Sequence, residues 1–355
     1  MKRWVRGCVV TVLLSLVALG GCSFFGGTEA VIDVDVLIGI VPLTISYDGT
    51  SSTGSGGIAT YHWWFGTEDE SMDGTGTYTY DDVGEYTLTL TVRSENGKTD
   101  TAHVTIVVEP AIWITDNNLD RIHKLDMDGI LRQTIDLPYA DPTGVTLGEV
   151  GGHDWLFVAC YNGGSQRIVR VDPVTGSVSE EYTAPAQSPL QITYGASSQE
   201  QLWHVDGLSR KIYRINPPDC QVYEAYGQTY FKATSPQVTN VTFLQTPQGL
   251  DWTYAQNTQG YLWYLEGETH LLYKIEIIPG YDIMSSTQLQ VEGDAIELPS
   301  EIFPVGAIDI MDDMLWAIDV DNHRLVEIDL ATGQLTGVAI YGFPGSAPGG
   351  LEIQH

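Results

Sequence analysis

Four acidic residues recur at the ends of similar aromatic segments in the second half of the chain. They are Asp116, Asp206, Glu266 and Asp319. A repeated fold brings such residues to one face, where their carboxylate oxygens could hold Ca²⁺. At a strand end, however, a carboxylate also accepts hydrogen bonds from turn N–H groups and pairs with a downstream Arg or Lys. Because Cys160 interrupts the series, we favour this structural role over a metal site.

A second set of polar residues lies on segments that begin after a proline, where polar and apolar residues alternate. The candidates for ligand binding among them are Gln191, Asp251, Asp309 and Glu352, with Thr146 and Thr193 at further polar positions. Gln191 stands where the other four copies have Gly, and a departure from a repeat is a better functional candidate than its consensus. The alternative is that these groups are merely hydrated at the mouth of a channel.

No signature of catalysis accompanies these candidates. The eight His residues are scattered, and the chain has no His-x-x-His pair, Gly-x-Ser-x-Gly elbow or Walker loop. No Cys/His spacing typical of zinc sites occurs either. We therefore assign no catalytic residue and predict no cofactor, with Ca²⁺ at the acidic series left open.

The overall charge restricts the possible partners. The 355 residues include 46 Asp and Glu against 16 Lys and Arg, which gives a formal net charge of −30. Such a chain cannot neutralise a phosphate backbone, and this excludes a nucleic-acid binder. With 43% hydrophobic residues, the chain can still bury a core.

A repeating unit from Ala111 onward contains both sets of candidate residues. An aromatic strand, a polar turn and a second apolar strand occur five times in succession. The aromatic residues of the copies are Trp113, Phe157, Trp203, Trp263 and Trp316. The strand that begins after a proline makes up the other half of the unit. Repeats of about 40–60 residues are typical of four-stranded β-propeller blades with their loops.

The array resembles NHL-like and related propellers over nearly all of residues 111–355. Its best local match is the turn Asp-x-x-Asn-His-Arg-Leu, residues 319–325. We predict five blades, with six as the alternative if a degenerate blade lies within 226–246 or 282–301. Residues 348–353 repeat the first-strand motif without partners of their own. They should therefore supply the innermost strand of the first blade and remove an open sheet edge.

Residues 31–109 predict a separate, smaller β-sandwich, so the chain as a whole is all-β. Two alternating segments joined by an Asn96-Gly97 turn are a strong hairpin signal. The segments 42–49, 61–66 and 84–90 resemble the motifs of PKD domains, Ig-like modules common on bacterial surface proteins. The resemblance implies an Ig-like fold with a spacer or adhesive role, and places the boundary to the propeller at residue 110.

The first domain departs from that family at one turn. Trp64 stands where Asp is usual, and Thr67-Glu68 stands where Asp-Gly is usual. The resemblance therefore carries no ion-binding role over to this turn. Trp63 should pack in the core of the sandwich, as large aromatic residues do.

Residues 1–21 read as a secretory signal. Three basic residues precede an apolar run, 9–19, that is too short for a permanent membrane anchor. The segment Leu19-Gly20-Gly21-Cys22 resembles a bacterial lipobox, which implies cleavage before Cys22 and lipidation of its thiol. Residues 22–30 would then be a lipidated tether. Ser23 implies sorting to the outer membrane, where the protein would be periplasmic or surface-exposed.

The chain has four Cys residues, of which Cys8 falls in the signal and Cys22 is the lipidation site. Cys160 and Cys220 remain, and they lie in different repeats. A disulfide between them is open in an oxidising compartment, because spacing alone does not decide geometry. Two buried or idle thiols are favoured.

The domain order predicts a non-enzymatic surface lipoprotein. A lipid anchor in the membrane and a PKD spacer would present a propeller that binds a protein or glycan ligand. Propellers host many functions, so this expectation depends largely on the fold. The alternative is an exported metal-assisted lyase or hydrolase that uses carboxylates and His at the channel mouth.

Overall fold

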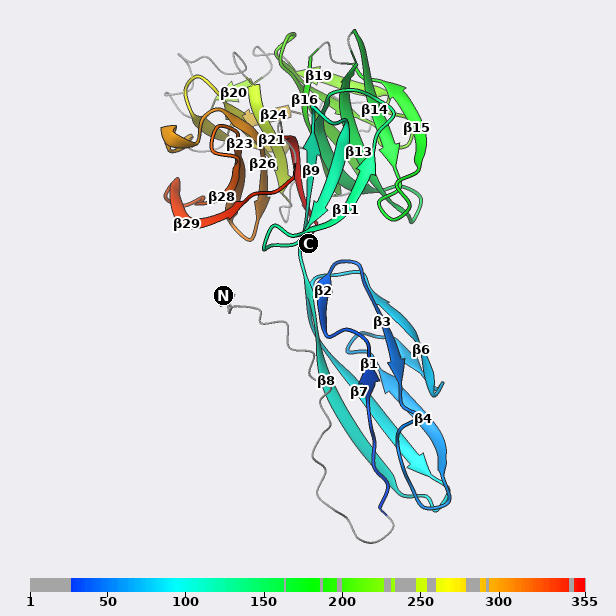
Figure 1. Ribbon diagram of the computed structural model, residues 1–355. Helices are drawn as coiled ribbons and strands as arrows, with labels where there is room; N and C mark the ends of the chain where they lie inside the picture. The colour runs from blue at the N-terminus through cyan, green and yellow to red at the C-terminus, as the bar shows by residue number, and fades with distance from the viewer. Residues whose placement is uncertain are drawn as a thin grey trace. The chain divides into compact units, whose positions relative to one another are not determined.

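The computed structural model describes residues 27–162, 164–185, 188–196, 200–226, 231–233, 247–253, 260–278, 288–291, 294–344 and 348–354. The predicted signal peptide and Cys22 lie outside these residues. In the part described, no helix is long and apolar enough to cross a membrane. The chain forms two compact all-β units, one around residues 44–78 and 85–106 and one from residue 107 onward (Figure 1).

The first unit is a sandwich of two sheets. One sheet has the order β1 (Asp33–Val34), β3 (Leu43–Asp48) and β6 (Thr75–Tyr80). The other has the order β2 (Ile38–Ile40), β8 (Thr99–Glu109), β7 (Gly84–Ser94), β4 (Ile58–Trp64) and β5 (Glu70–Ser71). Alternation along β7 buries Leu88, Leu90 and Val92 and turns its threonines to the other face. The predicted β7–β8 hairpin is confirmed, with Gly97 at a φ of 84° that favours glycine.

Trp63 lies at the centre of the sandwich core, as predicted. Its side chain is fully buried, and its ring centroid is 4.7 Å from that of Tyr47. The indole N–H donates to the Asp73 carbonyl at 3.0 Å, which offsets the cost of burying a polar group. The neighbouring Trp64 is exposed, and its N–H donates to the Thr67 carbonyl at 2.7 Å. The turn that departs from the PKD pattern is therefore held by this indole.

The second unit contains five sheets within its described residues. The first has the order β30 (Pro348–Gln354), β9 (Ala111–Asp116), β10 (Arg121–Leu125), β11 (Leu131–Asp136). The second has β12 (Pro142–Glu149), β13 (Asp154–Asn162), β14 (Ser165–Val171), β15 (Val178–Thr183). The third has β16 (Pro189–Ala196), β17 (Glu200–Asp206), β18 (Lys211–Ile215), β19 (Val222–Tyr226).

The remaining two sheets follow the same plan. The fourth has the order β21 (Pro247–Thr253), β22 (Tyr261–Glu266), β23 (Leu271–Ile278), β24 (Gln288–Val291), β20 (Phe231–Ala233), and β25 (Ile296–Glu297) also pairs with β23. The fifth has β26 (Val305–Met311), β27 (Met314–Asp319), β28 (Arg324–Asp329), β29 (Gln334–Tyr341). A short 3₁₀ turn, Ser300–Ile302, precedes β26.

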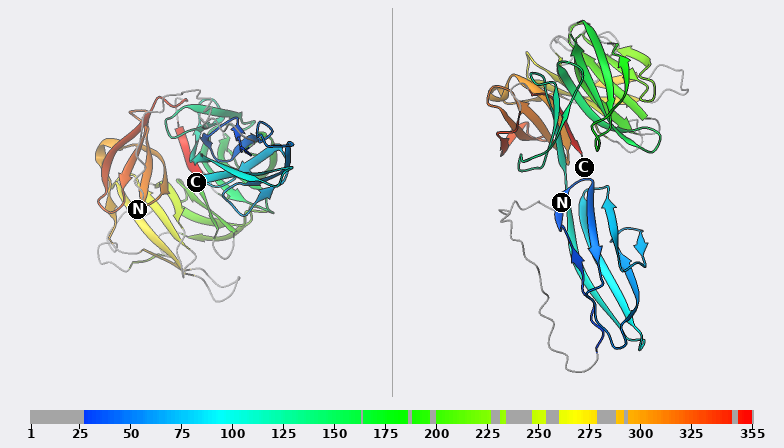
Figure 2. Two further views of the ribbon diagram at one scale, coloured as in Figure 1. Left: turned by 90° about the horizontal axis from the view of Figure 1, so that it is seen from below. Right: turned by 45° about the vertical axis from the view of Figure 1, so that its right-hand side comes forward.

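The five sheets surround a common centre (Figure 2). Their innermost strands contact one another in the order β30, β12, β16, β21, β26, and β26 contacts β30 again. Strand β30 pairs antiparallel with β9, which confirms the predicted place of the C-terminal segment in the first sheet. The sixth-blade alternative depended on residues 226–246 and 282–301. Their described strands β20, β24 and β25 pair within the fourth sheet, and other parts of those segments lie outside the described residues.

The aromatic residue of each repeat packs against the following sheet. Trp113 belongs to the same buried hydrophobic cluster as Val145 and Val158 of the second sheet, and Trp316 to that of Ile112 and Leu351 of the first. Phe157, Trp203 and Trp263 occupy the corresponding places in the other three interfaces. Each interface therefore buries a large apolar side chain, and such burial contributes about 1.5–3 kcal/mol per side chain.

Candidate functional site

The two sets of candidate residues lie at different levels of the sheets. The acidic series ends each second strand and pairs in register with the start of the inner strand, as Asp116 does with Pro348 and Asp206 with Pro189. The second set lies further along the inner strands, where Glu352 opposes Trp113. The structure does not bring the two sets together into one site.

Three members of the acidic series, Asp116, Asp206 and Asp319, accept hydrogen bonds from the turn that follows their strand. Asp206 is fully buried and accepts the N–H groups of Ser188 at 2.7 Å and Ser209 at 3.0 Å. Asp319 is also fully buried and accepts the Asn322 N–H at 3.1 Å and the Arg324 guanidinium at 2.7 Å. The pKa of Arg324 is raised, first of all by its hydrogen bond to Asp319. This is the turn-capping role favoured from the sequence.

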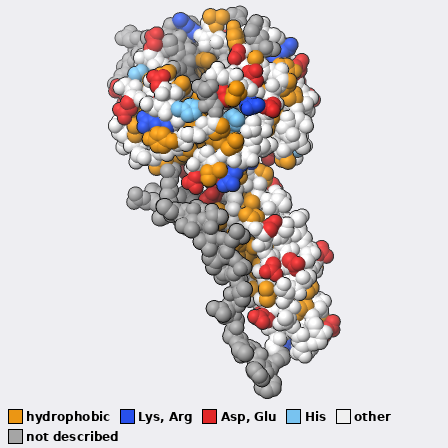
Figure 3. Space-filling model, in the orientation of Figure 1, with side chains coloured by type: hydrophobic (Ala, Val, Ile, Leu, Met, Phe, Trp, Pro, Cys, Tyr) orange, Lys and Arg blue, Asp and Glu red, His pale blue; other side chains and the backbone are white. Residues whose placement is uncertain are grey.

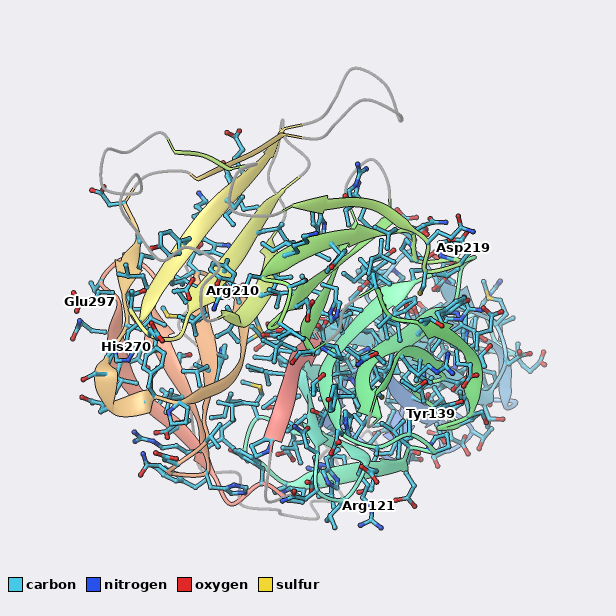
Figure 4. All side chains as sticks on the ribbon, turned by 90° about the horizontal axis from the view of Figure 1, so that it is seen from above. Arg121, Tyr139, Arg210, Asp219, His270 and Glu297 are labelled. Carbon is cyan, nitrogen blue, oxygen red and sulfur yellow. The ribbon has the colours of Figure 1, made fainter. Side chains whose placement is uncertain are left out.

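The other two members have local partners as well. Asp116 accepts the Asn118 N–H at 3.0 Å, and Glu266 accepts the Tyr264 hydroxyl at 2.7 Å. Each of the four turns contains a residue with a φ between 50° and 59°. These residues are Asp120, Arg210, His270 and His323, and Figure 4 labels Arg210 and His270 on neighbouring sheets. Among the described residues, no group of three or more His, Cys, Asp or Glu is arranged to hold a metal ion.

The remaining thiols are buried and unbridged. Cys160 and Cys220 are both free cysteines in the interior. Burial raises the pKa of each thiol to about 12, so neither is a reactive thiolate at neutral pH. The prediction that these two thiols are buried is confirmed.

Gln191 joins three inner strands instead of facing an open channel. Its Oε1 accepts the N–H groups of Leu250 at 3.0 Å and Ile308 at 3.2 Å, and its amide donates to the Ile308 carbonyl. Close packing explains the glycines at this level. A Cβ on Gly144 would lie 2.6 Å from a carbonyl oxygen of the next inner strand, and one on Gly350 would lie 2.7 Å from the nitrogen of Val145. The Gln191 amide is buried and bonded to the inner strands around it.

Five residues of the inner strands form a ring one step beyond Gln191, which we call the inner belt. Its members are Thr146, Thr193, Asp251, Asp309 and Glu352. Each lies opposite the aromatic residue on the second strand of its own sheet. Each also makes a hydrogen bond to the inner strand of the next sheet. The hydrogen bonds of the belt therefore link the five sheets around the centre.

The first half of the inner belt runs from Glu352 to the third sheet. The Glu352 carboxylate accepts hydrogen bonds from the Thr146 hydroxyl and the Leu147 N–H. Thr146 Oγ1 in turn accepts the Tyr194 N–H at 3.0 Å. These bonds cross from the first sheet to the second and from the second to the third.

The second half of the inner belt completes the circle. Thr193 donates to Asp251 Oδ1 at 3.1 Å, and Asp251 Oδ2 accepts the Ile310 N–H at 2.8 Å. Asp309 Oδ2 accepts the Ile353 N–H at 3.1 Å, which returns to the first sheet. Three of the five belt members are thus carboxylates, and they follow one another around the ring.

A cavity of about 610 Å³ lies beside the three belt carboxylates. This volume is in the usual range for small-ligand sites. Its lining residues are Thr193, Tyr194, Asp251, Tyr261, Trp263, Lys274, Asp309, Ile310, Asp312, Asp313, Leu330, Glu352 and Ile353. Three of the four candidates for ligand binding, Asp251, Asp309 and Glu352, therefore line one cavity, whereas Gln191 does not.

Burial raises the pKa of the belt carboxylates. Desolvation raises the pKa of Asp309 to about 7, although its backbone hydrogen bonds act in the opposite direction. The pKa of Glu352 is raised well above its ordinary value, first by desolvation and then by the charges of Asp309 and Asp251. Ionisation of all three neighbouring carboxylates is unfavourable, because they are buried and repel one another. The cluster therefore retains a proton near neutral pH.

Two further groups of residues line the cavity: an aromatic wall formed by Tyr261 and Trp263, with Lys274 against it, and an acidic turn. The Lys274 ammonium lies 3.8 Å from the ring centroid of Tyr261 and 5.8 Å from that of Trp263. Asp312 and Asp313 form the two-residue turn between β26 and β27, with φ values of 54° and 64°. Such a turn favours Asn-Gly, and two Asp residues here place two exposed carboxylates at the cavity.

Sequence reasoning found the carboxylates and missed the wall. Tyr261, Trp263 and Lys274 come from the second and third strands of one sheet, and their repeat positions suggested only blade packing. The Asp312-Asp313 pair had a visible signal, since two acidic residues interrupt a hairpin between Met311 and Met314. Nothing in the sequence showed that this turn and the fourth sheet meet at one cavity.

Known proteins match the two units separately. Residues 40–108 match the family model of the PKD domain. This unit is a PKD domain. Over 81 residues the chain is 33% identical to the pre-pro-metalloprotease PrtV of Vibrio cholerae, in two strains, a match that covers 23% of this chain and 9% of that protein. The chain thus spans less than a tenth of the length of the curated relatives it matches.

Each of the two units has similar solved structures, and one is given for each. The crystal structure of the PKD1 domain of Vibrio cholerae PrtV is 30% identical, covers 23% of this chain and 96% of that domain, and has a TM-score of 0.21. The crystal structure of the β-propeller domain of Myceliophteria thermophila Cps50 (Swd1) is 12% identical, covers 78% of this chain and 86% of that one, and has a TM-score of 0.38. The chain combines a PKD domain with a β-propeller-like unit.

Proposed function

We propose that this chain is a non-enzymatic lipoprotein of the bacterial outer membrane, anchored through Cys22, in which the PKD domain is a spacer and the propeller binds a protein or glycan ligand. The observation that carries the proposal is the cavity at the inner belt. It combines carboxylates with aromatic side chains, and a concave site where polar and aromatic groups converge is typical of ligand sites. The PKD domain adds no catalytic cluster among its described residues.

The inner belt supports binding because it fixes the cavity carboxylates before a ligand arrives. Asp251 and Asp309 accept backbone N–H groups of neighbouring sheets at 2.8 Å and 3.1 Å. A group held by the strands around it loses little freedom when it binds a ligand, and this preorganisation favours affinity. These belt carboxylates can therefore bind a ligand without a rearrangement of the inner strands.

The ligand-binding role is tested by capture from intact cells. Full-length protein and a variant carrying Asp309→Asn and Glu352→Gln are displayed and cross-linked to bound material. Both substitutions keep a hydrogen-bond acceptor for the belt and remove charge. We expect the variant to lose the captured protein or glycan, whereas Asp136→Asn, an exposed residue outside the cavity, should retain it. Equal capture by all three proteins would contradict a binding role for the cavity.

The anchoring role has a separate test. Cys22→Ala should release the protein from membranes without changing its thermal unfolding, because residue 22 precedes the PKD match at residues 40–108 and the propeller in the sequence. Two acyl chains or more give stable anchoring, and the variant has no thiol at residue 22 to carry them. Incorporation of radiolabelled palmitate measures the attachment directly. Label that persists in the variant would rule out Cys22 as the site.

One observation favours the enzymatic alternative, an exported metal-assisted lyase or hydrolase. Asp309 and Glu352 have raised pKa values in a cavity, and carboxylic acids tuned in this way act in general acid–base catalysis. Tight binding of Ca²⁺ or Mg²⁺ that is lost in an Asp251→Ala/Glu352→Ala double variant would support this alternative. Retained capture of a partner without turnover would favour the binding role.

A further inference from the structure

We propose that the cavity recognises its ligand through an organic cation, an ammonium or guanidinium group; this rests on the ligand-binding role proposed above for the same cavity. The charges of the lining are strongly unequal. Five carboxylates line it, from Asp251, Asp309, Asp312, Asp313 and Glu352, against the one ammonium of Lys274. The chain as a whole is acidic, and on the face of the PKD domain seen in Figure 3 acidic side chains far outnumber basic ones.

The aromatic wall gives a second, independent indication. The chain's own ammonium, on Lys274, lies over the faces of Tyr261 and Trp263. A ring face attracts a cation through its quadrupole, and the attraction reaches about 2 kcal/mol where water is excluded. The wall is therefore built of rings that already hold an alkylammonium group inside the cavity. Tyr194 adds another ring to the lining, and its hydroxyl is used in a bond to the Glu149 carbonyl at 2.9 Å.

The belt carboxylates can accept hydrogen bonds from such a group without leaving the belt. Asp309 uses Oδ2 for the Ile353 N–H, and a carboxylate has about four lone-pair positions in total. A hydroxyl-rich neutral sugar could also donate to these oxygens, but it brings no charge to offset the cluster. An ammonium or guanidinium group supplies both donors and charge, and such charge-assisted bonds are roughly twice as strong as neutral ones.

A cation that binds should displace the proton that the carboxylate cluster retains. The groups that face the cluster are Asp251 on β21, Asp309 on β26 and Glu352 on β30, with Thr146 on β12 and Thr193 on β16. Asp312, Asp313 and Lys274 complete the charged lining. When the cation enters, the proton leaves to solvent and the carboxylates ionise. Affinity should therefore rise as pH increases through about 7, the pKa of Asp309.

Two sources could supply the cation, a free small amine or a basic side chain that protrudes from a protein. Putrescine serves as the probe for the first source. The second is probed by a Gly-Gly-Lys-Gly-Gly peptide with both ends capped and by the same peptide with Arg. The matching norleucine peptide keeps the aliphatic length without the charge, and a neutral hexasaccharide tests the glycan outcome. Calorimetric titrations of the full chain at pH 8 and pH 5.5 measure each affinity.

We expect the Lys or Arg peptide to bind at pH 8 at least tenfold more tightly than the norleucine peptide or the hexasaccharide. At pH 5.5 its affinity should fall at least tenfold, because the probe then competes with the proton. Asp309→Asn/Glu352→Gln should weaken binding by a similar factor and remove most of the pH dependence. Asp136→Asn, outside the cavity, should bind as the unchanged protein does.

A second variant keeps the inference testable if the belt substitutions disturb folding. Asp312→Asn/Asp313→Gly removes two exposed charges and introduces the residues that this turn type prefers. It should fold at least as well and bind the basic peptide several-fold more weakly. If putrescine alone binds, the source is a small amine; if only the peptides bind, it is a protein side chain.

Any of three results would overturn the inference. One is a hexasaccharide or norleucine peptide that binds as tightly as the charged probes. Another is cation binding that neither pH nor the two charge-removing variants change. Partner capture that depends on Asp309 and Glu352, without any binding of cationic probes, would leave the proposed function in place and remove only the cation inference.

Discussion

The propeller uses the same residue type in opposite ways at two levels of its sheets. In the acidic series, Asp206 and Asp319 are fully buried and accept hydrogen bonds from their own turns. In the inner belt, Asp251 and Asp309 accept hydrogen bonds from a different sheet. A carboxylate held within one turn stabilises one blade. A carboxylate held by the neighbouring blade stabilises the ring and remains beside the cavity.

The difference also separates repetition from function. The acidic series recurs in four of the five sheets because those four share the same kind of turn, whereas Cys160 takes its place in the second. The inner belt varies, from Thr in two sheets to carboxylates in three, although its hydrogen-bonding role is shared. Threonine satisfies that role without charge. The excess of carboxylates on three successive inner strands is therefore not explained by the belt alone, and it coincides with the cavity.

The largest expected effect comes from breaking the ring itself. Deletion of residues 347–355 removes β30, which includes the buried Leu351 and Ile353 and the belt residue Glu352. The first sheet loses its inner strand, and Asp309 loses the N–H that it binds across the closure. We expect loss of cooperative unfolding of the propeller, because repeat arrays depend on contacts between neighbours.

Thermal melts of the truncated and full-length chains measure this effect. The PKD domain serves as the internal control, since its own sheets do not include β30. A propeller midpoint unchanged by the deletion would show that the ring closes without its C-terminal strand.

The next effect concerns one turn of the acidic series. Asp319→Ala removes a buried acceptor of Asn322 and leaves the Arg324 guanidinium without its 2.7 Å partner. Loss of one member of a largely buried pair should lower the free energy of unfolding by about 2–4 kcal/mol. Asp136→Ala breaks an exposed pair with Arg121 and should change it by less than about 1 kcal/mol. Urea unfolding checks both, and equal effects would contradict the turn-capping role.

The sequence predicted the acidic series better than the belt because its contacts are local. Asp206 binds a residue three positions away, and Asp319 binds one five positions away. Such spacings are visible in a single sequence. The belt bonds of Asp309 and Asp251 span 44 and 59 residues, and only the register of several sheets brings those residues together.

The fold was largely predictable because its signals are periodic. Alternation, turn residues and the repeated aromatic strand indicated an all-β chain with a sandwich and a propeller, and β30 occupies its predicted place. Gln191 shows the limit of such reasoning. Its departure from the repeat marked it as a candidate for ligand binding, but its amide is buried and bonds to neighbouring inner strands. The space available at the centre of the ring cannot be predicted from the repeat pattern of the sequence.

A smaller effect, on the pH dependence of the free energy of unfolding, should distinguish the inner belt from the acidic series. The pKa of Asp309 is about 7 in the folded protein against an ordinary value of 3.8. The folded state therefore binds a proton more tightly than the unfolded state. The stability from this group is fully present below about pH 4 and is lost as pH rises to about 7. Between pH 5 and pH 8 we expect the contribution of Asp309 to the free energy of unfolding to fall by on the order of 2–3 kcal/mol.

Asp309→Asn isolates this contribution because it removes the titrating group and keeps an acceptor for the Ile353 N–H. Buried His204, whose pKa is lowered to about 4 by desolvation, acts in the opposite direction below about pH 6.5 in both proteins. The difference between the two stability profiles therefore reports Asp309. Parallel profiles from pH 5 to pH 8 would show that Asp309 titrates normally.

The smallest effect is expected at Gln191, between the two levels. Gln191→Ala leaves the buried N–H groups of Leu250 and Ile308 without their acceptor, at a cost of about 1–2 kcal/mol in the free energy of unfolding. Because Gln191 does not line the cavity, ligand capture should stay unchanged at temperatures where the variant is folded. Urea unfolding and cell-surface capture of the same protein separate the two roles. Lost capture with unchanged stability would reverse the assignment, since Gln191 would then contact the ligand and the centre of the ring would be open to it.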